Sequence, residues 1–357
     1  MRILALVTLC CSLAIPAWSA DFSANADGVI RTYIRPAAER MAVASAKLPD
    51  AVSAVCSEPA DATRSAFAVA YGETVVAFAR VGFLRFGPLV EEDRLSRLAF
   101  LPDARGTAQR QIRKVFAARD QKVTDAATLT GKSVALQGLT ALQLIAFNRD
   151  GAVVLGEAGE TREFTCQYAQ AIAVNVAGIS DAVSKAWSDP NGYSSVLLSP
   201  SPDHNQIRSS QDAMETIFNA LVTGLIVTKD QDILPALGKG PGKPKPHRVP
   251  FSRSGNGLAY VAAELDGIDA ALKALKYDGL LAEEFAWLPS SLAFEFQNAQ
   301  KILGGIEPPV RTSLRDNEAY GRFKVLLLTI DSLRDTIALE LAGALSLAGG
   351  FNALDGD

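Results

Sequence analysis

Histidine and cysteine are scarce in this chain of 357 residues. The two histidines are His204 and His247, and neither an H-E-x-x-H nor a G-x-S-x-G motif occurs. A zinc peptidase normally uses two or more imidazoles and a general base, and a serine hydrolase needs a histidine beside its nucleophile. The sequence therefore offers little chemical support for a hydrolase, and no motif in it indicates a particular cofactor.

Concentrated basic charge is also missing, as is a long uncharged apolar run beyond the first residues. The formal net charge of −4 argues against nucleic acid as a partner, because nucleic-acid binding needs a basic face. The most apolar later segment, 325–348, carries Asp331, Arg334, Asp335 and Glu340, which would be costly in hydrocarbon. We interpret it as a long helix with one face in a protein core.

Residues 1–20 have the parts of a secretory signal: Arg2, an apolar run over 3–15 and small residues around 17–20. The mature chain would begin near residue 21 and would be periplasmic, with membrane contact only through export or peripheral association. Lipid attachment at Cys10 is the less favoured alternative, because the leucine before it is bulky for such a signal.

Removal of the signal leaves two cysteines, Cys56 and Cys166. Disulfides persist in the periplasm, so we predict a bridge between them, which could contribute ~4 kcal/mol in the loop-entropy model. Two buried free thiols are the alternative.

Apolar residues recur at helical spacing almost everywhere, for example from Ile30 to Leu48, and no segment shows sustained strand alternation. We also expect Asp61 to cap a helix. The prediction is an all-α fold of two helical bundles, with an N-terminal domain over 21–195 and a C-terminal domain over 196–357. The boundary is placed in 188–205, where prolines and polar residues cluster.

Two groups of charged residues are candidates for a site. Arg85 lies in the apolar run 81–86 and must find a partner or water, for which Asp103 is the candidate. An all-oxygen cation site such as calcium prefers could form at 91–93 or at the terminal acids Asp355 and Asp357, although adjacent acids are usually solvated.

Several separated segments together resemble the imelysin family, also called peptidase M75, of bacterial envelope proteins. These segments are Arg85-Phe86-Gly87-Pro88, Phe100-Leu101-Pro102-Asp103, Gln137-Gly138-Leu139-Thr140-Ala141-Leu142, Arg253-Ser254-Gly255 and the terminus Gly350-Phe351-Asn352-Ala353-Leu354-Asp355-Gly356-Asp357. The resemblance implies a two-domain helical fold, a periplasmic or surface location and an association with iron acquisition.

The family's G-x-H-x-x-E motif falls on 138–143, and its two metal-ligand positions hold Thr140 and Gln143. A hydroxyl and an amide are poor ligands for a transition metal, so the motif is chemically degenerate. The metal content of the protein is therefore unknown. Candidate ligand-binding residues are Arg85, Asp103, Gln137, Thr140, Gln143, Asn352 and Asp355. A purely structural Arg85–Asp103 network is the alternative.

Three functional hypotheses follow. The leading one is an exported imelysin-like binding or accessory protein that works with other envelope iron-uptake components and does not hydrolyse its ligand. The alternative is an M75-like metallopeptidase with a displaced metal site, in which His204 or His247 converges with acids on Thr140. A third is a binder of an anionic polymer or partner protein that uses the basic, proline-rich loop from Gly238 to Arg253, although such a loop is more often an exposed connector between helices.

Overall fold

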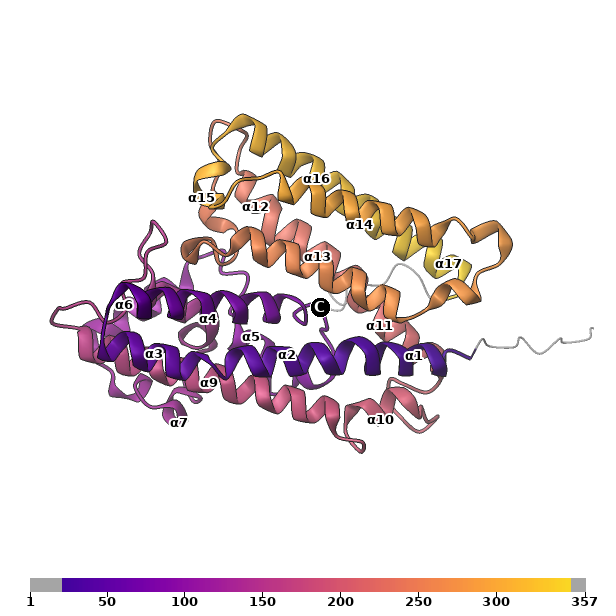
Figure 1. Ribbon diagram of the computed structural model, residues 1–357. Helices are drawn as coiled ribbons and strands as arrows, with labels where there is room; N and C mark the ends of the chain where they lie inside the picture. The colour runs from indigo at the N-terminus through magenta and orange to yellow at the C-terminus, as the bar shows by residue number, and fades with distance from the viewer. Residues whose placement is uncertain (1–20, 348–357) are drawn as a thin grey trace, which may run out of the picture.

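The fold is all-α, as predicted, in the computed structural model, which describes residues 21–347. In that range the only β-type contact is an isolated antiparallel bridge between Phe147 and Val153. Helices from the N-terminal half form one layer and helices from the C-terminal half form a second layer across it (Figure 1). No helix within 21–347 has both the length and the apolar character needed to cross a membrane.

The N-terminal layer contains ten α-helices and one π-helical turn. They are α1 (Ser23–Val29), η1 (Ile30–Ile34), α2 (Arg35–Ser45), α3 (Leu48–Ser57), α4 (Asp61–Ala79), α5 (Arg94–Leu98), α6 (Thr107–Ala118), α7 (Ala126–Leu129), α8 (Gly138–Ala146), α9 (Arg162–Ser188) and α10 (Tyr193–Leu198).

The C-terminal layer continues from α11 to α17. It comprises α11 (Ser210–Val227), the π-helical η6 (Thr228–Ile233), α12 (Leu234–Leu237), α13 (Gly257–Ala274), α14 (Leu288–Gly304), α15 (Val310–Ser313), α16 (Asn317–Asp335), the π-helical η11 (Thr336–Leu341) and α17 (Ala342–Ala344). Short 3-10 turns connect helices in both layers: η2 (Gly87–Leu89), η3 (Glu91–Asp93), η4 (Gln121–Val123), η5 (Val134–Leu136), η7 (Pro246–Arg248), η8 (Ser252–Ser254), η9 (Tyr277–Leu280) and η10 (Glu283–Phe285).

Two helix boundaries differ from the sequence prediction. The stripe from Ile30 to Leu48 is divided, because α2 ends at Ser45 and α3 begins at Leu48. Pro49 in the first turn of α3 lacks an N–H and cannot continue the preceding helix. Asp61 is the first helical residue of α4 and not its cap; Ala60 occupies the cap position.

The two layers share a hydrophobic core in which α4 packs against α13. Aromatic rings from both halves meet there: the centroid of Tyr71 lies 5.1 Å from that of Phe147 and 6.5 Å from that of Phe251. The Tyr71 hydroxyl donates a hydrogen bond of 2.8 Å to the Leu139 carbonyl, which fixes α8 to α4. The predicted domain boundary at 195/196 falls within α10, and the division into two domains stays a prediction.

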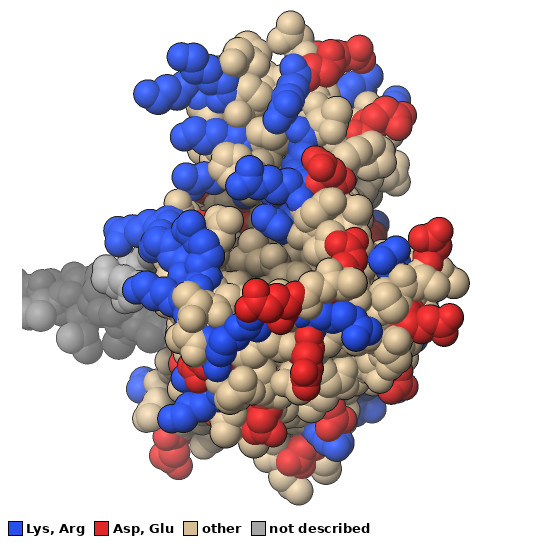
Figure 2. Space-filling model, turned by 90° about the vertical axis from the view of Figure 1, so that its left-hand side faces the viewer, with Lys and Arg blue, Asp and Glu red and all other residues tan. Residues whose placement is uncertain are grey.

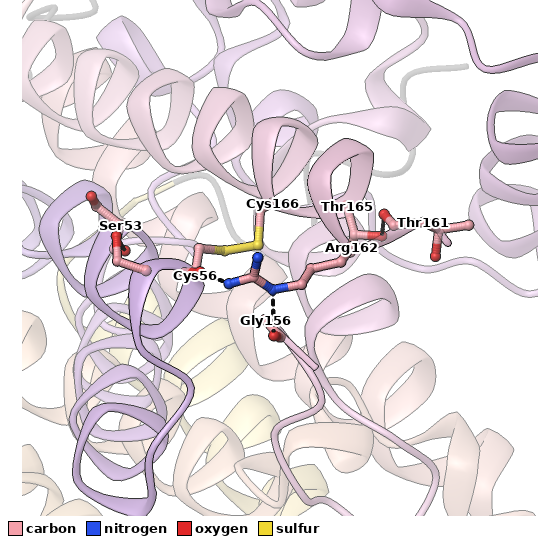
Figure 3. The surroundings of a disulfide bond; sticks show 8 residues. Ser53, Cys56, Gly156, Thr161, Arg162, Thr165 and Cys166 are labelled. Atoms are coloured by element: carbon pink, nitrogen blue, oxygen red, sulfur yellow. Dashed lines mark hydrogen bonds between the residues drawn. A yellow bond between two sulfur atoms is a disulfide. The ribbon is translucent and has the colours of Figure 1, made fainter. Parts of the chain in front are cut away.

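The predicted disulfide is confirmed. Cys56 on α3 is bonded to Cys166 on α9 across a sequence separation of 110 residues (Figure 3). Arg162 lies beside the bridge and donates hydrogen bonds to the carbonyls of Gly156, at 2.8 Å, and Cys56. These contacts hold the start of α9 against the end of α3.

Candidate functional site

The motif helix α8 begins against α5 at a position that only glycine fits. Gly138 has a φ of +73°, and a Cβ there would collide with the backbone carbonyls of Arg97 and Leu98. A residue with a side chain would be strained by both the dihedral angle and the contact. The glycine of the Gln137-Gly138-Leu139 segment is therefore explained by the close packing of its backbone against the backbone at the end of α5.

Thr140 and Gln143 occupy the two motif positions one helical turn apart and are buried, with 5% and 9% of their surface exposed. The Thr140 hydroxyl oxygen accepts a hydrogen bond of 3.0 Å from the Phe100 N–H. The Gln143 side-chain oxygen is buried and has no hydrogen-bond partner in the described range. A hydroxyl already used as an acceptor and one neutral amide oxygen do not fit a transition metal, which favours imidazole, thiolate or carboxylate ligands.

Gln137, just before α8, ties three segments together. Its side-chain oxygen accepts hydrogen bonds from Arg97, at 3.3 Å, and from Asn175, at 3.2 Å, while its amide donates to the Lys132 carbonyl at 2.8 Å. The side chain is completely buried. Gln137 is thus a structural tie between α5, α9 and the segment before α8.

The predicted pairing of Arg85 with Asp103 is wrong. Asp103 accepts hydrogen bonds from the backbone N–H groups of Thr107, at 2.6 Å, and Ala108, at 2.9 Å, so it caps the start of α6. No ion pair joins it to Arg85 within the described range. A carboxylate that neutralises the first N–H groups of a helix is already satisfied by local bonds.

Arg85 instead lies in a small internal cavity with two buried acids, Asp232 and Glu264, and the phenol of Tyr260. The cavity volume is about 20 Å³, enough for a single water. Its walls are completed mainly by apolar residues: Phe78, Gly82, Phe83, Leu95, Ala99, Leu101, Gly224 and Val227, together with Gln231. Asp103, Gln137, Thr140 and Gln143 are not in this lining, although Phe100, which binds Thr140, lies between two residues that are.

Three segments bring this polar cluster together. Arg85 follows α4, Asp232 lies in the π-helical turn η6, and Tyr260 and Glu264 are one turn apart on α13. Residues four apart on a helix share a face, so the phenol and the carboxyl point the same way. Asp232 and Glu264 are 2% and 5% exposed, and the Thr228 hydroxyl donates to Glu264 at 3.4 Å.

Burial governs the ionisation of the two acids. Desolvation raises the pKa of Asp232 to about 7, against the lowering effects of a hydrogen bond from Glu264 and the charge of Arg85. Desolvation and the neighbouring Asp232 raise the pKa of Glu264 well above its ordinary value. The contact between the two acids lowers the pKa of Asp232 and raises that of Glu264, so the buried pair favours a state in which the two carboxyls share one proton.

The remaining sequence candidates do not converge on this cluster. His204 accepts hydrogen bonds at its Nδ1 from the N–H groups of Gln206 and Ile207 in its own loop. His247 lies in the basic loop, where burial and neighbouring cations lower its pKa. Residues Glu91 and Glu92 are exposed and pair with Arg94.

The terminal candidates Asn352, Asp355 and Asp357 lie outside the described residues, as does the predicted signal over 1–20. Within 21–347, no group of three or more His, Cys, Asp and Glu side chains is arranged to hold a metal ion.

The two-layer helical fold is that of imelysin-like proteins. An imelysin-like protein from Psychrobacter arcticum 273-4 matches with a TM-score of 0.76 at 18% sequence identity, over 92% of this chain and 97% of that one. A protein from Parabacteroides distasonis ATCC 8503, named as a candidate iron-regulated protein A precursor, matches with a TM-score of 0.72 at 14% identity, over 91% and 94%.

The sequence model of the imelysin family (peptidase M75) matches residues 34–338, so the chain belongs to that family. The predicted family resemblance is confirmed. No curated protein matches the sequence.

Proposed function

We propose that the protein is an exported binding or accessory protein of the bacterial cell envelope, linked to iron acquisition, that recognises its ligand without hydrolysing it. The observation that carries the proposal is the state of the motif helix. Thr140 and Gln143 stand at the positions of the metal ligands, and the Thr140 hydroxyl is already used to hold Phe100. Chemistry that depends on a metal at this helix has no suitable ligands.

Three further observations support the cellular setting. The chain belongs to the imelysin family, and one structural neighbour is named as a candidate iron-regulated protein. The Cys56–Cys166 disulfide is consistent with an oxidising compartment outside the cytoplasm. The first twenty residues have the pattern of a periplasmic export signal.

The cluster around Arg85 supports recognition and architecture better than hydrolysis. Its cavity admits a single water and is closed by apolar side chains, so a peptide bond could not reach Glu264 or Asp232. Arg85, Asp232 and Glu264 line this one cavity from the end of α4, η6 and α13, and α4 packs against α13, so the cluster lies where the two layers meet.

Calorimetric titration with ferrous, ferric, zinc and calcium ions tests the proposal. We expect no micromolar transition-metal binding that depends on α8 in the natural protein, and a gain of such binding in the double variant Thr140→His with Gln143→Glu, which restores the family motif. Circular dichroism shows whether that variant folds. Micromolar binding by the natural protein that disappears in Thr140→Ala or Gln143→Ala would contradict the proposal, and chelator-sensitive cleavage of a protein substrate would favour the metallopeptidase alternative.

A further inference from the structure

Three arginines from three separate segments converge where the two layers meet. Arg149 lies in the turn after α8, Arg253 on η8 and Arg311 on α15. Arg253 donates a hydrogen bond of 2.8 Å to the Phe147 carbonyl. Arg311 donates to the Arg149 carbonyl at 3.1 Å and to the Ser252 hydroxyl at 3.3 Å. We call these three residues the arginine cluster.

The arginine cluster has no ion pair with any acid in the described range. Burial and the charge of Arg149 lower the pKa of Arg253, and burial, Arg253 and Arg149 lower that of Arg311. Asp150 is the only carboxylate that acts in the opposite direction on Arg311. Positive charge is thus gathered in a half-buried place without matching negative charge.

Two other half-buried arginines of the protein, Arg94 and Arg334, have acidic partners. Arg94 lies within ion-pair distance of Glu91 and Glu92, and Arg334 within that of Asp331 and Asp335. The absence of acidic partners around the arginine cluster, in the part of the chain that the structure describes, matters because burying like charges side by side is unfavourable. A bound anion would offset this desolvation and repulsion.

The surroundings add further positive charge. Lys245, His247 and Arg248 of the basic loop lie beside the cluster, and the charge of Arg311 reaches His247. α15 lies at the left end of the upper layer in Figure 1, and Figure 2 turns the left-hand side of the molecule toward the viewer. On that end, Lys and Arg side chains gather along one side and over the upper layer. Asp and Glu side chains are more scattered, and more of them lie in the lower part of the view.

We propose that the arginine cluster is a binding site for a phosphate-type oxyanion. Guanidinium groups present parallel N–H donors that match two oxygens of a phosphate or carboxylate, and several of them around one centre favour a multiply charged anion. Carbonyl hydrogen bonds orient Arg253 and Arg311, while the exposed Arg149 makes no side-chain hydrogen bond within 21–347. Its full set of donors is free for the ligand.

Arg149→Gln is the decisive substitution. It removes one charge from the cluster and leaves in place the Arg149 carbonyl that binds Arg311. Calorimetric titration of the mature chain with inorganic phosphate is expected to show one site in the natural protein. We expect Arg149→Gln to weaken this site by ~10-fold, the loss of one charge-assisted interaction. The affinity should also fall steeply as sodium chloride is raised.

Arg40→Gln is the matched control, because Arg40 is exposed on α2 and belongs to no ion pair in the described range. Its phosphate affinity should equal that of the natural protein. Absence of phosphate binding, or equal weakening by both substitutions, would overturn the proposal.

Sedimentation with vesicles of phosphatidylglycerol and phosphatidylcholine, compared with pure phosphatidylcholine, separates a free anion from a lipid headgroup. Vesicle binding that depends on Arg149, joined to phosphate binding, would identify the headgroup as one source of the same chemistry. Vesicle binding without phosphate binding would refute a phosphate site. The site does not depend on the proposed iron-linked role, and it can stand if that role fails.

Discussion

The shared proton of the Asp232–Glu264 pair predicts that Glu264→Gln will change how stability depends on pH. A glutamine has nearly the shape of a protonated glutamate, and its amide can donate to Asp232 as the carboxyl does. Its oxygen can still accept from Tyr260 and Thr228, which bind Glu264 in the natural protein. At about pH 5, where the carboxyl is protonated, we expect the variant to be within ~1 kcal/mol of the natural protein.

The difference should grow as pH rises. Between its unfolded and folded pKa values, a carboxyl with a raised pKa is protonated in the folded state but ionised in the unfolded chain. The stability that it contributes is therefore fully present below the unfolded pKa. That contribution is lost as pH rises through the folded pKa, at ~1.4 kcal/mol per pH unit for one retained proton. The window opens near the ordinary carboxyl range and extends upward through the raised pKa values, which are about 7 for Asp232 and well above the ordinary value for Glu264.

Over two pH units the natural protein should therefore lose ~3 kcal/mol relative to Glu264→Gln. Urea unfolding followed by circular dichroism between about pH 5 and about pH 8 measures the difference. Glu340→Gln makes the same chemical change on an exposed residue of η11 and should follow the natural profile. If the free energy of unfolding of Glu264→Gln and of the natural protein changed with pH in parallel, Glu264 would carry no extra proton in the folded state.

Variants at Thr140, at Gly138 and at the two cysteines test the structural explanation of the motif helix and the disulfide by urea unfolding. Thr140→Val leaves the Phe100 N–H without its acceptor and should cost ~1–3 kcal/mol, whereas Thr140→Ser should retain most of the stability. Gly138→Ala should cost at least ~1 kcal/mol, because its methyl group would meet backbone carbonyls at a positive φ; an unchanged midpoint would disprove that contact. Replacing both Cys56 and Cys166 by alanine should cost up to ~4–5 kcal/mol, given the 110-residue separation, and reductant should then have no further effect.

The helical fold was predictable because its signal is local. An apolar residue every three or four positions is enough to indicate a helix with one buried face, and this pattern covers most of the chain. The break between α2 and α3 was harder to predict, because the apolar spacing continues through it. Pro49 was the available signal, since a proline in the first turn of a helix commonly marks its start.

The disulfide was predictable for a different reason. Once residues 1–20, the predicted export signal, are set aside, Cys56 and Cys166 have no other cysteine to pair with. Their pairing therefore required no knowledge of the distance between α3 and α9.

The partner of Arg85 could not be chosen in this way. Asp103 is near in sequence, but its carboxylate accepts hydrogen bonds from the backbone N–H groups at the start of α6. These local hydrogen bonds do not depend on the position of Arg85. The acids that share a cavity with Arg85 come from η6 and α13, and their position depends on how the C-terminal layer packs onto α4. Tertiary packing, which leaves no trace in sequence spacing, decided which acids lie near Arg85.

One signal for the missed acid was nevertheless present in the sequence. Glu264 lies next to Leu265 and three residues after Val261, in a stripe of apolar residues that both sequence periodicity and the structure place in the core. A carboxyl on the buried face of a helix has to be protonated, paired or both, because an isolated buried charge is prohibitively costly. The same reasoning that required a partner for Arg85 in an apolar run also applied to Glu264, and both residues line a single cavity together with Asp232.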